Sequence, residues 1–331
     1  MKRIVAIIAL GALTALALIP SVTKGQQISA NSQYLQNPYI INPAASGIND
    51  GLDISSSYRK QWAGLQEAPQ TYYLSGHAAI NKPRQNRTRR YSLRGSRFRK
   101  FEKNNDKVYH AVGGFMARDE AGAFRKTLVK ASYAVHVPFS SRLTVSFGAA
   151  GGVSRFELDR SKVDFFDSND PSYQNFLRNG STPGVFDLSA GIWAYTSRLF
   201  VGYSSEQILR NDIIQNRNGN RTVYDMHHFL TAGYDFSLNE SWNLVPSFLI
   251  RYVNPAPATF DINLQASYLD QYWAGLSYRH QNAVVLLAGV RIVDWLNVGY
   301  SFDYPTTAIR SHANGSHEFF LNFSGLIMKY R

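Results

Sequence analysis

The feature that most limits how this chain can fold is a repeated two-residue alternation of apolar and polar side chains. From Phe260 to Tyr268 every second residue is apolar, and the residues between them are Asp, Asn, Gln and Ser. The pattern recurs in 129–137, 230–238 and 296–303. Because successive side chains of a strand point to opposite faces, each segment predicts a strand with one apolar and one polar face.

About fourteen such strands can be placed after residue 50, separated by turn-forming residues. Strands of soluble β-sandwich proteins also alternate. However, large apolar faces repeated this often favour a membrane barrel, whose strands separate lipid from a polar lumen. We therefore predict an all-β fold, a transmembrane antiparallel β-barrel spanning 51–331. The expected strands are 51–62, 69–80, 108–118, 125–138, 141–156, 184–195, 198–205, 226–237, 242–253, 258–269, 271–280, 283–292, 294–304 and 316–328.

Residues 1–25 predict a secretory signal peptide. Lys2 and Arg3 precede an apolar run from Ile4 to Ile19, and small residues lead to a cleavage site expected near Gly25–Gln26. The run is short for a membrane helix, and no later stretch reaches the ~18 apolar residues that a spanning helix needs. We therefore expect export to the outer membrane of a Gram-negative bacterium.

Composition agrees with an exported barrel. Aromatic residues make up 14% of the chain and charged residues 18%, against roughly 25% charged residues in soluble domains. There is no cysteine, which excludes lipid attachment through cysteine, disulfides and thiolate metal sites. We expect contact with outer-membrane lipids and no nucleic-acid partner.

Residues 26–50 do not alternate, and Asn-Pro pairs at 37–38 and 42–43 indicate an irregular segment. Tyr34 and Tyr39 argue against a loose tail. Charged residues on the polar faces of the strands could hydrogen-bond an inserted segment. We predict that 26–50 forms a plug or periplasmic lid. The charged residues expected in the lumen are Arg59, Asp187, Asp235, Arg251, Asp261, Arg279 and Asp303.

Loop lengths orient the barrel, because periplasmic turns are short and external loops are long. Long loops at 157–183, 206–225 and 305–315 fall on one side, and short turns fall on the other side with both termini. The exception is a basic insert at 81–107, which the same count places on the periplasmic side.

The basic insert carries the formal excess charge of the mature chain, with eleven Lys and Arg between Lys82 and Lys107 against Glu102 and Asp106. Three interpretations stay open. It could dock an acidic periplasmic partner, bind anionic headgroups or cell wall at about 1 kcal/mol per cation, or form a solvated loop. The candidate docking residues are Arg84, Arg87, Arg89, Arg90, Arg94, Arg97, Arg99 and Lys100.

No pattern favours catalysis, a metal or a cofactor. His227 and His228 would face opposite sides of one strand and could not chelate one ion together. The sequence Ser316–His317–Glu318 superficially resembles the residues of a hydrolase site. On a strand, however, neighbouring side chains point to opposite faces, so His317 would point away from Ser316 and Glu318. Gly148–Gly152 precedes no helix and so is not a phosphate loop. Glycines there suit barrel curvature or close contact with a plug.

Four tryptophans lie near expected periplasmic strand ends, where an aromatic girdle would stand: Trp193, Trp242, Trp273 and Trp295. Strict alternation turns Trp193, Trp273 and Trp295 inward, however. Either the girdle is mainly tyrosine, or some expected registers differ by one residue.

Several motifs, in order along the mature chain, resemble the PorP/SprF family of outer-membrane proteins. They are Asn37–Gly47 (NPYIINPAASG), Tyr58–Leu65 (YRKQWAGL), Ala68–His77 (APQTYYLSGH), Pro246–Tyr252 (PSFLIRY), Trp273–Arg279 (WAGLSYR), Val298–Tyr304 (VGYSFDY) and Gly315–Glu318 (GSHE). The family-motif residues are Asn37, Pro38, Asn42, Pro43, Gly47, Arg59, Gln61, Trp62, Pro69, Ser316 and His317.

The resemblance implies a non-enzymatic component of the type IX secretion system of Bacteroidota. It implies delivery or anchoring of a surface adhesin with a type B C-terminal signal domain, and in some members a part in gliding motility. The implied partners are that adhesin, the periplasmic ring lipoprotein and peptidoglycan-binding components. The Arg-rich insert departs from the family pattern, so its role stays open.

An alternative is a plugged outer-membrane channel for small or hydrophobic molecules, similar in layout to fatty-acid transporters with an N-terminal hatch. The charged faces expected in the lumen disfavour it, because a fatty-acid route needs an apolar pocket.

Overall fold

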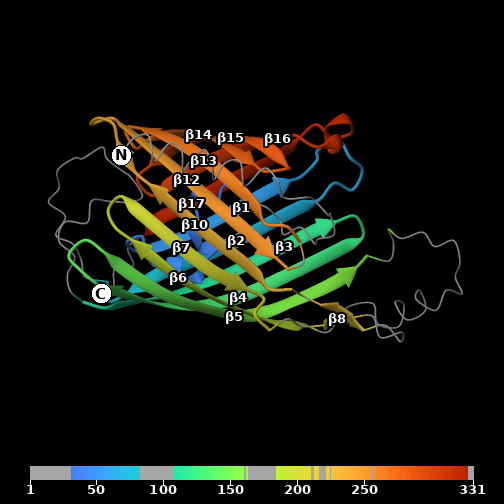
Figure 1. Ribbon diagram of the computed structural model, residues 1–331, viewed down its shortest axis with the longest axis horizontal. Coiled ribbons are helices and arrows are strands. Elements are labelled where there is room, and N and C mark those ends of the chain that lie inside the picture. The colour runs from blue at the N-terminus through green and yellow to red at the C-terminus, as the bar shows by residue number, and fades with distance from the viewer. Residues whose placement is uncertain are drawn as a thin grey trace, which may run out of the picture.

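The computed structural model describes residues 31–82, 107–159, 162, 184–209, 212–215, 221–223, 225–254 and 256–326. The expected signal peptide and the eight candidate docking cations from Arg84 to Lys100 lie outside these residues. Within them, antiparallel strands form a closed barrel (Figure 1).

Fourteen strands form the wall: β1 (Leu52–Lys60), β2 (Gln70–Ile80), β3 (Tyr109–Ala121), β4 (Phe124–Pro138), β5 (Thr144–Leu158), β6 (Val185–Tyr195), β7 (Leu199–Glu206), β10 (His227–Tyr234), β12 (Trp242–Val253), β13 (Thr259–Tyr268), β14 (Tyr272–Arg279), β15 (Ala283–Val293), β16 (Leu296–Pro305) and β17 (Ser316–Leu326). They pair in chain order, and β1 closes the ring by pairing with β17. The short elements are β8 (Asp212–Gln215) paired with β9 (Arg221–Val223), β11 (Phe236–Ser237) paired with β12, and the 3-10 helices η1 (Pro38–Ile40), η2 (Pro43–Ala45) and η4 (Ala308–Ser311).

The predicted all-β barrel is confirmed, and its strand boundaries agree to within a few residues. One expected strand was wrong in detail. The segment 226–237 is divided into β10 and β11. The division falls at Asp235, whose backbone N–H donates to the carbonyl of Arg198 at 2.7 Å in the neighbouring turn. The ladder is interrupted there, which local alternation could not indicate.

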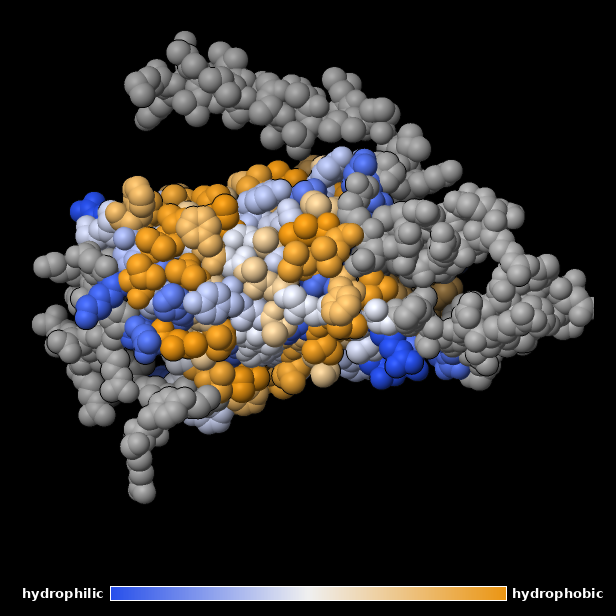
Figure 2. Space-filling model, turned by 90° about the horizontal axis from the view of Figure 1, so that it is seen from below, coloured by the Kyte–Doolittle hydropathy of each residue, from blue (hydrophilic) through white to orange (hydrophobic). Residues whose placement is uncertain are grey.

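The polar face of each strand points inward and the apolar face points outward, as in membrane barrels. In β13, Asp261 and Asn263 are buried, whereas the alternate residues Ile262 and Leu264 are 55% and 47% exposed. Figure 2 shows hydrophobic residues over much of the outer wall. Among the helices of the described ranges, none has the length and apolarity needed to cross a membrane.

The two ends of the barrel differ in their connections. Leu52 at the start of β1 pairs with Leu326 at the end of β17, so the wall begins and finishes at one end. This end, called the short-turn end below, contains the connections 139–143, 196–198, 238–241, 269–271 and 294–295, together with one long connection, 81–108. The opposite, long-loop end contains the long connections 61–69, 159–184, 207–226 and 306–315 and three short ones, 122–123, 254–258 and 280–282. Because short turns are typical of the periplasmic side, we expect the short-turn end to face the periplasm.

The tryptophans divide between the two faces of the wall. Trp193 and Trp273 are buried inside, as alternation predicts. Trp242 and Trp295 are exposed on the outside, so the inward orientation expected for Trp295 was wrong. Trp295 lies in the turn between β15 and β16, next to a register shift between Arg291 and Val293 that breaks the alternation.

Candidate functional site

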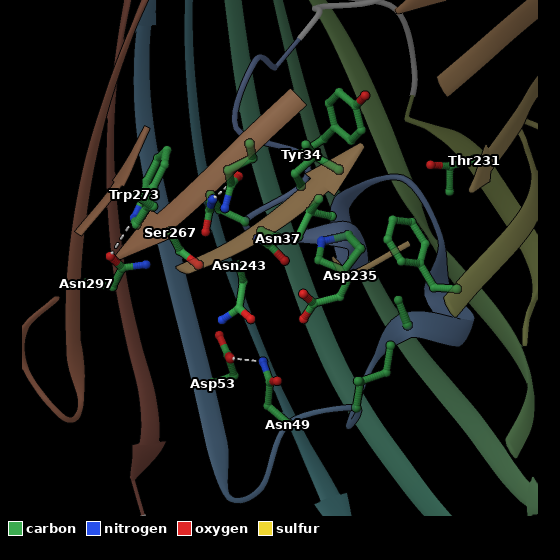
Figure 3. Close-up of a pocket in the computed structure, with 18 of the residues that line it drawn as sticks. Tyr34, Asn37, Asn49, Asp53, Thr231, Asp235, Asn243, Ser267, Trp273 and Asn297 are labelled. Carbon is green, nitrogen blue, oxygen red and sulfur yellow. Dashed lines mark hydrogen bonds between the residues drawn. The ribbon is translucent and has the colours of Figure 1, made fainter. Parts of the chain in front are cut away.

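Residues 31–50, called the N-terminal segment below, lie inside the barrel. Ser32 bonds to β16 and β17, Asn37 bonds to β2, and Tyr39 bonds to β4, so the segment contacts separate parts of the wall. Most of its residues are buried. Figure 3 shows Tyr34 and Asn37 among side chains of the surrounding strands. This is the position that a plug would occupy.

Each Asn-Pro pair begins a tight turn. Pro38 begins η1 and Pro43 begins η2, because proline is preorganised for the first helical position and needs no hydrogen-bond partner there. Asn42 caps η2 by accepting from the backbone N–H of Ala44 at 2.9 Å. The side-chain amide of Asn42 also donates to the carbonyls of Ile192 and Tyr203 at 3.0 and 3.1 Å. One side chain therefore both shapes the turn and fixes it to β6 and β7.

Glycines in the wall provide the room for this turn. A Cβ at Gly148 on β5 would collide with the backbone of Ala44, and a Cβ at Gly191 on β6 would collide with the side chain of Asn42. By contrast, Gly151 on β5 has no atom within 4 Å of its added Cβ. The sequence left two explanations for the glycines of 148–152, barrel curvature or close contact with an inserted segment. For Gly148 the structure shows close contact with the N-terminal segment.

A network of buried charges lies in the half of the lumen toward the long-loop end. Arg59 Nη2 lies 2.7 Å from Asp303 Oδ2, and Arg279 Nη1 lies 3.0 Å from the same oxygen. Arg279 and Arg251 both pair with Asp261, at 3.3 and 2.5 Å. Five of the seven charged residues expected in the lumen are thus joined in one network.

Ser32 links this network to the N-terminal segment. Its hydroxyl donates to Asp303 at 2.9 Å and accepts from Arg59 at 3.0 Å. Its backbone N–H donates to Glu318 at 2.7 Å, and Arg59 lies 3.4 Å from the same carboxylate. Because buried charges left without partners cost several kcal/mol each, these contacts hold the segment and the wall together.

Smaller contacts fix other parts of the lumen. Lys130 on β4 pairs with Asp187 on β6 at 3.1 Å and with Glu206 on β7 at 3.5 Å. Tyr34 accepts a hydrogen bond from the amide of Asn263 on β13. Burial raises the pKa of the Tyr34 phenol, so its hydroxyl stays neutral.

A cavity of about 100 Å³ lies between the N-terminal segment and the wall, toward the short-turn end (Figure 3). Its lining combines polar side chains with aliphatic and aromatic ones, and the apolar members include Leu35, Ile41, Ile48, Val245, Trp193 and Phe200. Asp53 on β1 accepts from Asn49 at 2.6 Å, and Trp273 donates to Asn297 at 3.2 Å. The labelled lining residues are Tyr34, Asn37, Asn49, Asp53, Thr231, Asp235, Asn243, Ser267, Trp273 and Asn297.

The structure places the family-motif residues in two separate regions, the lumen and the long-loop end. Asn37, Pro38, Asn42, Pro43 and Gly47 lie in the lumen. Asn37 donates to Ser75 at 2.8 Å and the N–H of Gly47 donates to His77 at 3.1 Å. Gly47 has φ +71°, and a Cβ there would collide with Ala111, so only glycine fits.

The second group lies at the long-loop end, where the loop 61–69 meets β17. The N–H of Gln61 donates to the carbonyl of Pro69 at 2.8 Å, and the N–H of Trp62 donates to Ser316 at 3.1 Å. His317 points outward and bonds to Tyr300 at 2.6 Å. Arg59, deeper on β1, connects this region to the charge network in the lumen.

The geometry of the histidines agrees with the sequence analysis. His227 is buried in the lumen, whereas His228 bonds outside to Tyr203 at 2.9 Å. Ser316 and His317 likewise face opposite sides of β17. In the described part of the chain, no group of His, Asp and Glu side chains is arranged to hold a metal ion.

Sequence reasoning missed three residues of the lumen site. Ser32 carries no signal in the sequence, because its role depends on charges more than two hundred residues away. Glu318 lies on the same face of β17 as the buried residues Ser316 and Phe320 and alternates with exposed Phe319, so it could have been assigned to the lumen face. Gly191 lies within an alternating segment, where a glycine can mark a close backbone approach.

Comparison with known proteins identifies the family. A family model described as "Type IX secretion system membrane protein PorP/SprF" matches residues 23–323. No curated protein matches the chain.

Solved structures share the barrel architecture only distantly. The CymD monoaromatic hydrocarbon channel is 11% identical, with 93% of this chain and 96% of that chain covered and a TM-score of 0.47. The TodX monoaromatic hydrocarbon channel deltaS2 mutant is 13% identical, with 87% and 93% covered and a TM-score of 0.45. The Acinetobacter baumannii outer membrane protein Omp33 is 9% identical, with 85% and 100% covered and a TM-score of 0.45. These similarities say nothing about function.

The family match spans nearly the whole chain, and the wall has the polar interior and apolar exterior of a membrane barrel. The protein is therefore an outer-membrane β-barrel that belongs to the PorP/SprF family of type IX secretion system membrane proteins.

Proposed function

We propose that this barrel delivers or anchors a surface adhesin with a type B C-terminal signal domain and couples it to the periplasmic secretion machinery. Its partners there would be the ring lipoprotein and peptidoglycan-binding components. The role is non-enzymatic, and a contribution to gliding motility belongs to the same proposal. The family match over 23–323 supports the secretion role.

One observation carries the proposal: the lumen is occupied by the chain's own N-terminal segment. Ser32 joins buried ion pairs in one half, and Asn42 is bonded to β6 and β7 in the other. A lumen occupied in this way suits a barrel that offers its two ends to partner proteins. In this proposal 26–50 is the plug, 1–25 is the cleaved signal, and the basic insert docks an acidic periplasmic partner.

The channel alternative has less support. A hydrophobic substrate would need an apolar pocket. The cavity beside the N-terminal segment mixes apolar side chains such as Ile41 with polar ones such as Asp53. In the lumen beyond it, a hydrophobic substrate would meet the buried ion pairs of Arg59 and Arg279.

The first test is affinity purification of the tagged barrel in mild detergent, followed by mass spectrometry of bound proteins. The tag is placed at 163–182, on the long-loop side, and an unrelated barrel from the same cells is the control. We expect a large surface protein together with periplasmic ring components. A solitary barrel would contradict the proposal, and planar-bilayer conductance would then test the channel function.

A further inference from the structure

Outward-facing side chains form two parallel rows across β2–β5, toward the long-loop end. The row nearer the middle of the barrel is aliphatic, and each member is at least 42% exposed. Its directly paired members are Leu74, Met116, Val129 and Val153. The next row toward the long-loop end consists of Tyr72, Arg118, Thr127 and Arg155, again directly paired. Two arginines therefore stand at the edge of the lipid-facing band.

These arginines are exposed and held in place. The side chains of Arg118 and Arg155 are 48% and 58% exposed, and Thr127 stands between them on β4. The next row toward the long-loop end contains Glu120 and Glu157. The Nε of Arg118 lies 2.7 Å from Glu120, and the Nε of Arg155 lies 3.2 Å from Glu157. The Nε contacts fix each guanidinium from the side away from the lipid band.

A third arginine lies beside the same two carboxylates. Arg125 bridges them, at 3.0 Å from Glu120 and 3.9 Å from Glu157. Within the described residues, Arg118, Arg125 and Arg155 thus surround Glu120 and Glu157. Within the described residues, the terminal N–H groups of Arg118 make no hydrogen bond or ion pair. A guanidinium presents paired N–H donors in one plane, a geometry that matches phosphate oxygens.

Three strands elsewhere in the wall, β14, β16 and β17, present aromatic side chains toward the long-loop end. The exposed residues there include Tyr278, Tyr304 and Phe319. Aromatic rings of this kind are usual where a barrel meets the membrane interface. The arginine row on β3–β5 therefore differs from the aromatic residues that β14, β16 and β17 expose toward the same end.

We propose that Arg118, Thr127 and Arg155 bind a phosphate group of the outer-leaflet glycolipid, lipid A. With the long-loop end outside, the arginine row lies at the level where lipid headgroups meet acyl chains. The hydroxyl of Thr127 adds a donor between the two guanidinium groups. Met116, Val129 and Val153 contact the acyl chains below. The site is independent of the lumen and of the proposed secretion partners.

The test uses the full-length protein, purified in mild detergent and titrated with lipid A while the bound fraction is read by native mass spectrometry. The variant Arg118→Gln/Arg155→Gln is compared with Arg142→Gln/Arg198→Gln, which removes the same charge from exposed turns at the short-turn end. Lipid A freed of phosphate by phosphatase serves as the second ligand. Resistance to unfolding in unheated detergent gels confirms that each variant is folded.

We expect at least a tenfold loss of lipid A affinity in the Arg118/Arg155 variant, no comparable loss in the matched variant, and weak binding of the dephosphorylated lipid. Equal losses in both variants would overturn the site, since general charge would then explain binding. Unchanged binding in the Arg118/Arg155 variant would overturn it directly. If phosphatidylglycerol bound the unaltered protein as tightly as lipid A, the assignment to the glycolipid would be wrong.

Discussion

Arg59 on β1 and Asp303 on β16 form a buried ion pair, 2.7 Å between Nη2 and Oδ2, although β17 lies between their two strands. Arg59 also pairs with Glu318 on β17 itself. The three side chains join the last strands of the wall to the first. Closure of the barrel therefore rests on lumen charges as well as on the backbone pairing of β1 with β17.

Replacing Arg59 with methionine should lower the free energy of unfolding by about 3–5 kcal/mol, because it leaves Glu318 buried without its cationic partner. The measurement is denaturant unfolding in micelles, followed by tryptophan fluorescence. Arg142→Met, in an exposed turn, should change stability by less than about 0.5 kcal/mol. Similar losses in the two variants would show that the ion pair adds no stability.

Gly148→Ala should displace the N-terminal segment, because the new Cβ would collide with the backbone of Ala44. The chain has no cysteine, so a single Ala45→Cys reporter can be labelled with a maleimide. Labelling should be faster with Gly148→Ala than in the parent. Gly151→Ala, on the same strand with open space at its Cβ, is the control. Equal labelling rates in both variants would contradict the close contact.

Removing residues 28–48 should open a conducting pore, because residues 31–48 lie in the lumen and include Ser32 and Asn42, which bond to the wall. Planar-bilayer recordings of the deletion and the full chain give the measurement. The full chain should show little conductance. A deletion variant that stays closed would mean that another part of the chain seals the barrel.

Deleting 84–103 should leave the barrel folded and weaken its association with periplasmic proteins, because this stretch contains all eight candidate docking cations. The readout is copurification of ring components from mild detergent. A matched deletion of 163–182, on the long-loop side, should leave copurification unchanged. Full recovery of the ring components without 84–103 would show that docking uses another surface.

The sequence by itself determined the architecture of the wall. Alternation is a local property of each strand, so Asp261, Ile262 and Asn263 reveal their faces without knowledge of the neighbours. Loop lengths likewise gave two unlike ends, and the Asn-Pro pairs marked the turns at η1 and η2.

Only the tertiary structure decided which residues meet. Ser32 lies against Asp303 because the N-terminal segment enters a closed ring, and no local pattern encodes that distance along the chain. The outward position of Trp295 depends on a register shift between β15 and β16. The row of Arg118, Thr127 and Arg155 exists only because three strands pair in one register. Faces follow from local periodicity, whereas partners follow from register and closure, which depend on the whole chain.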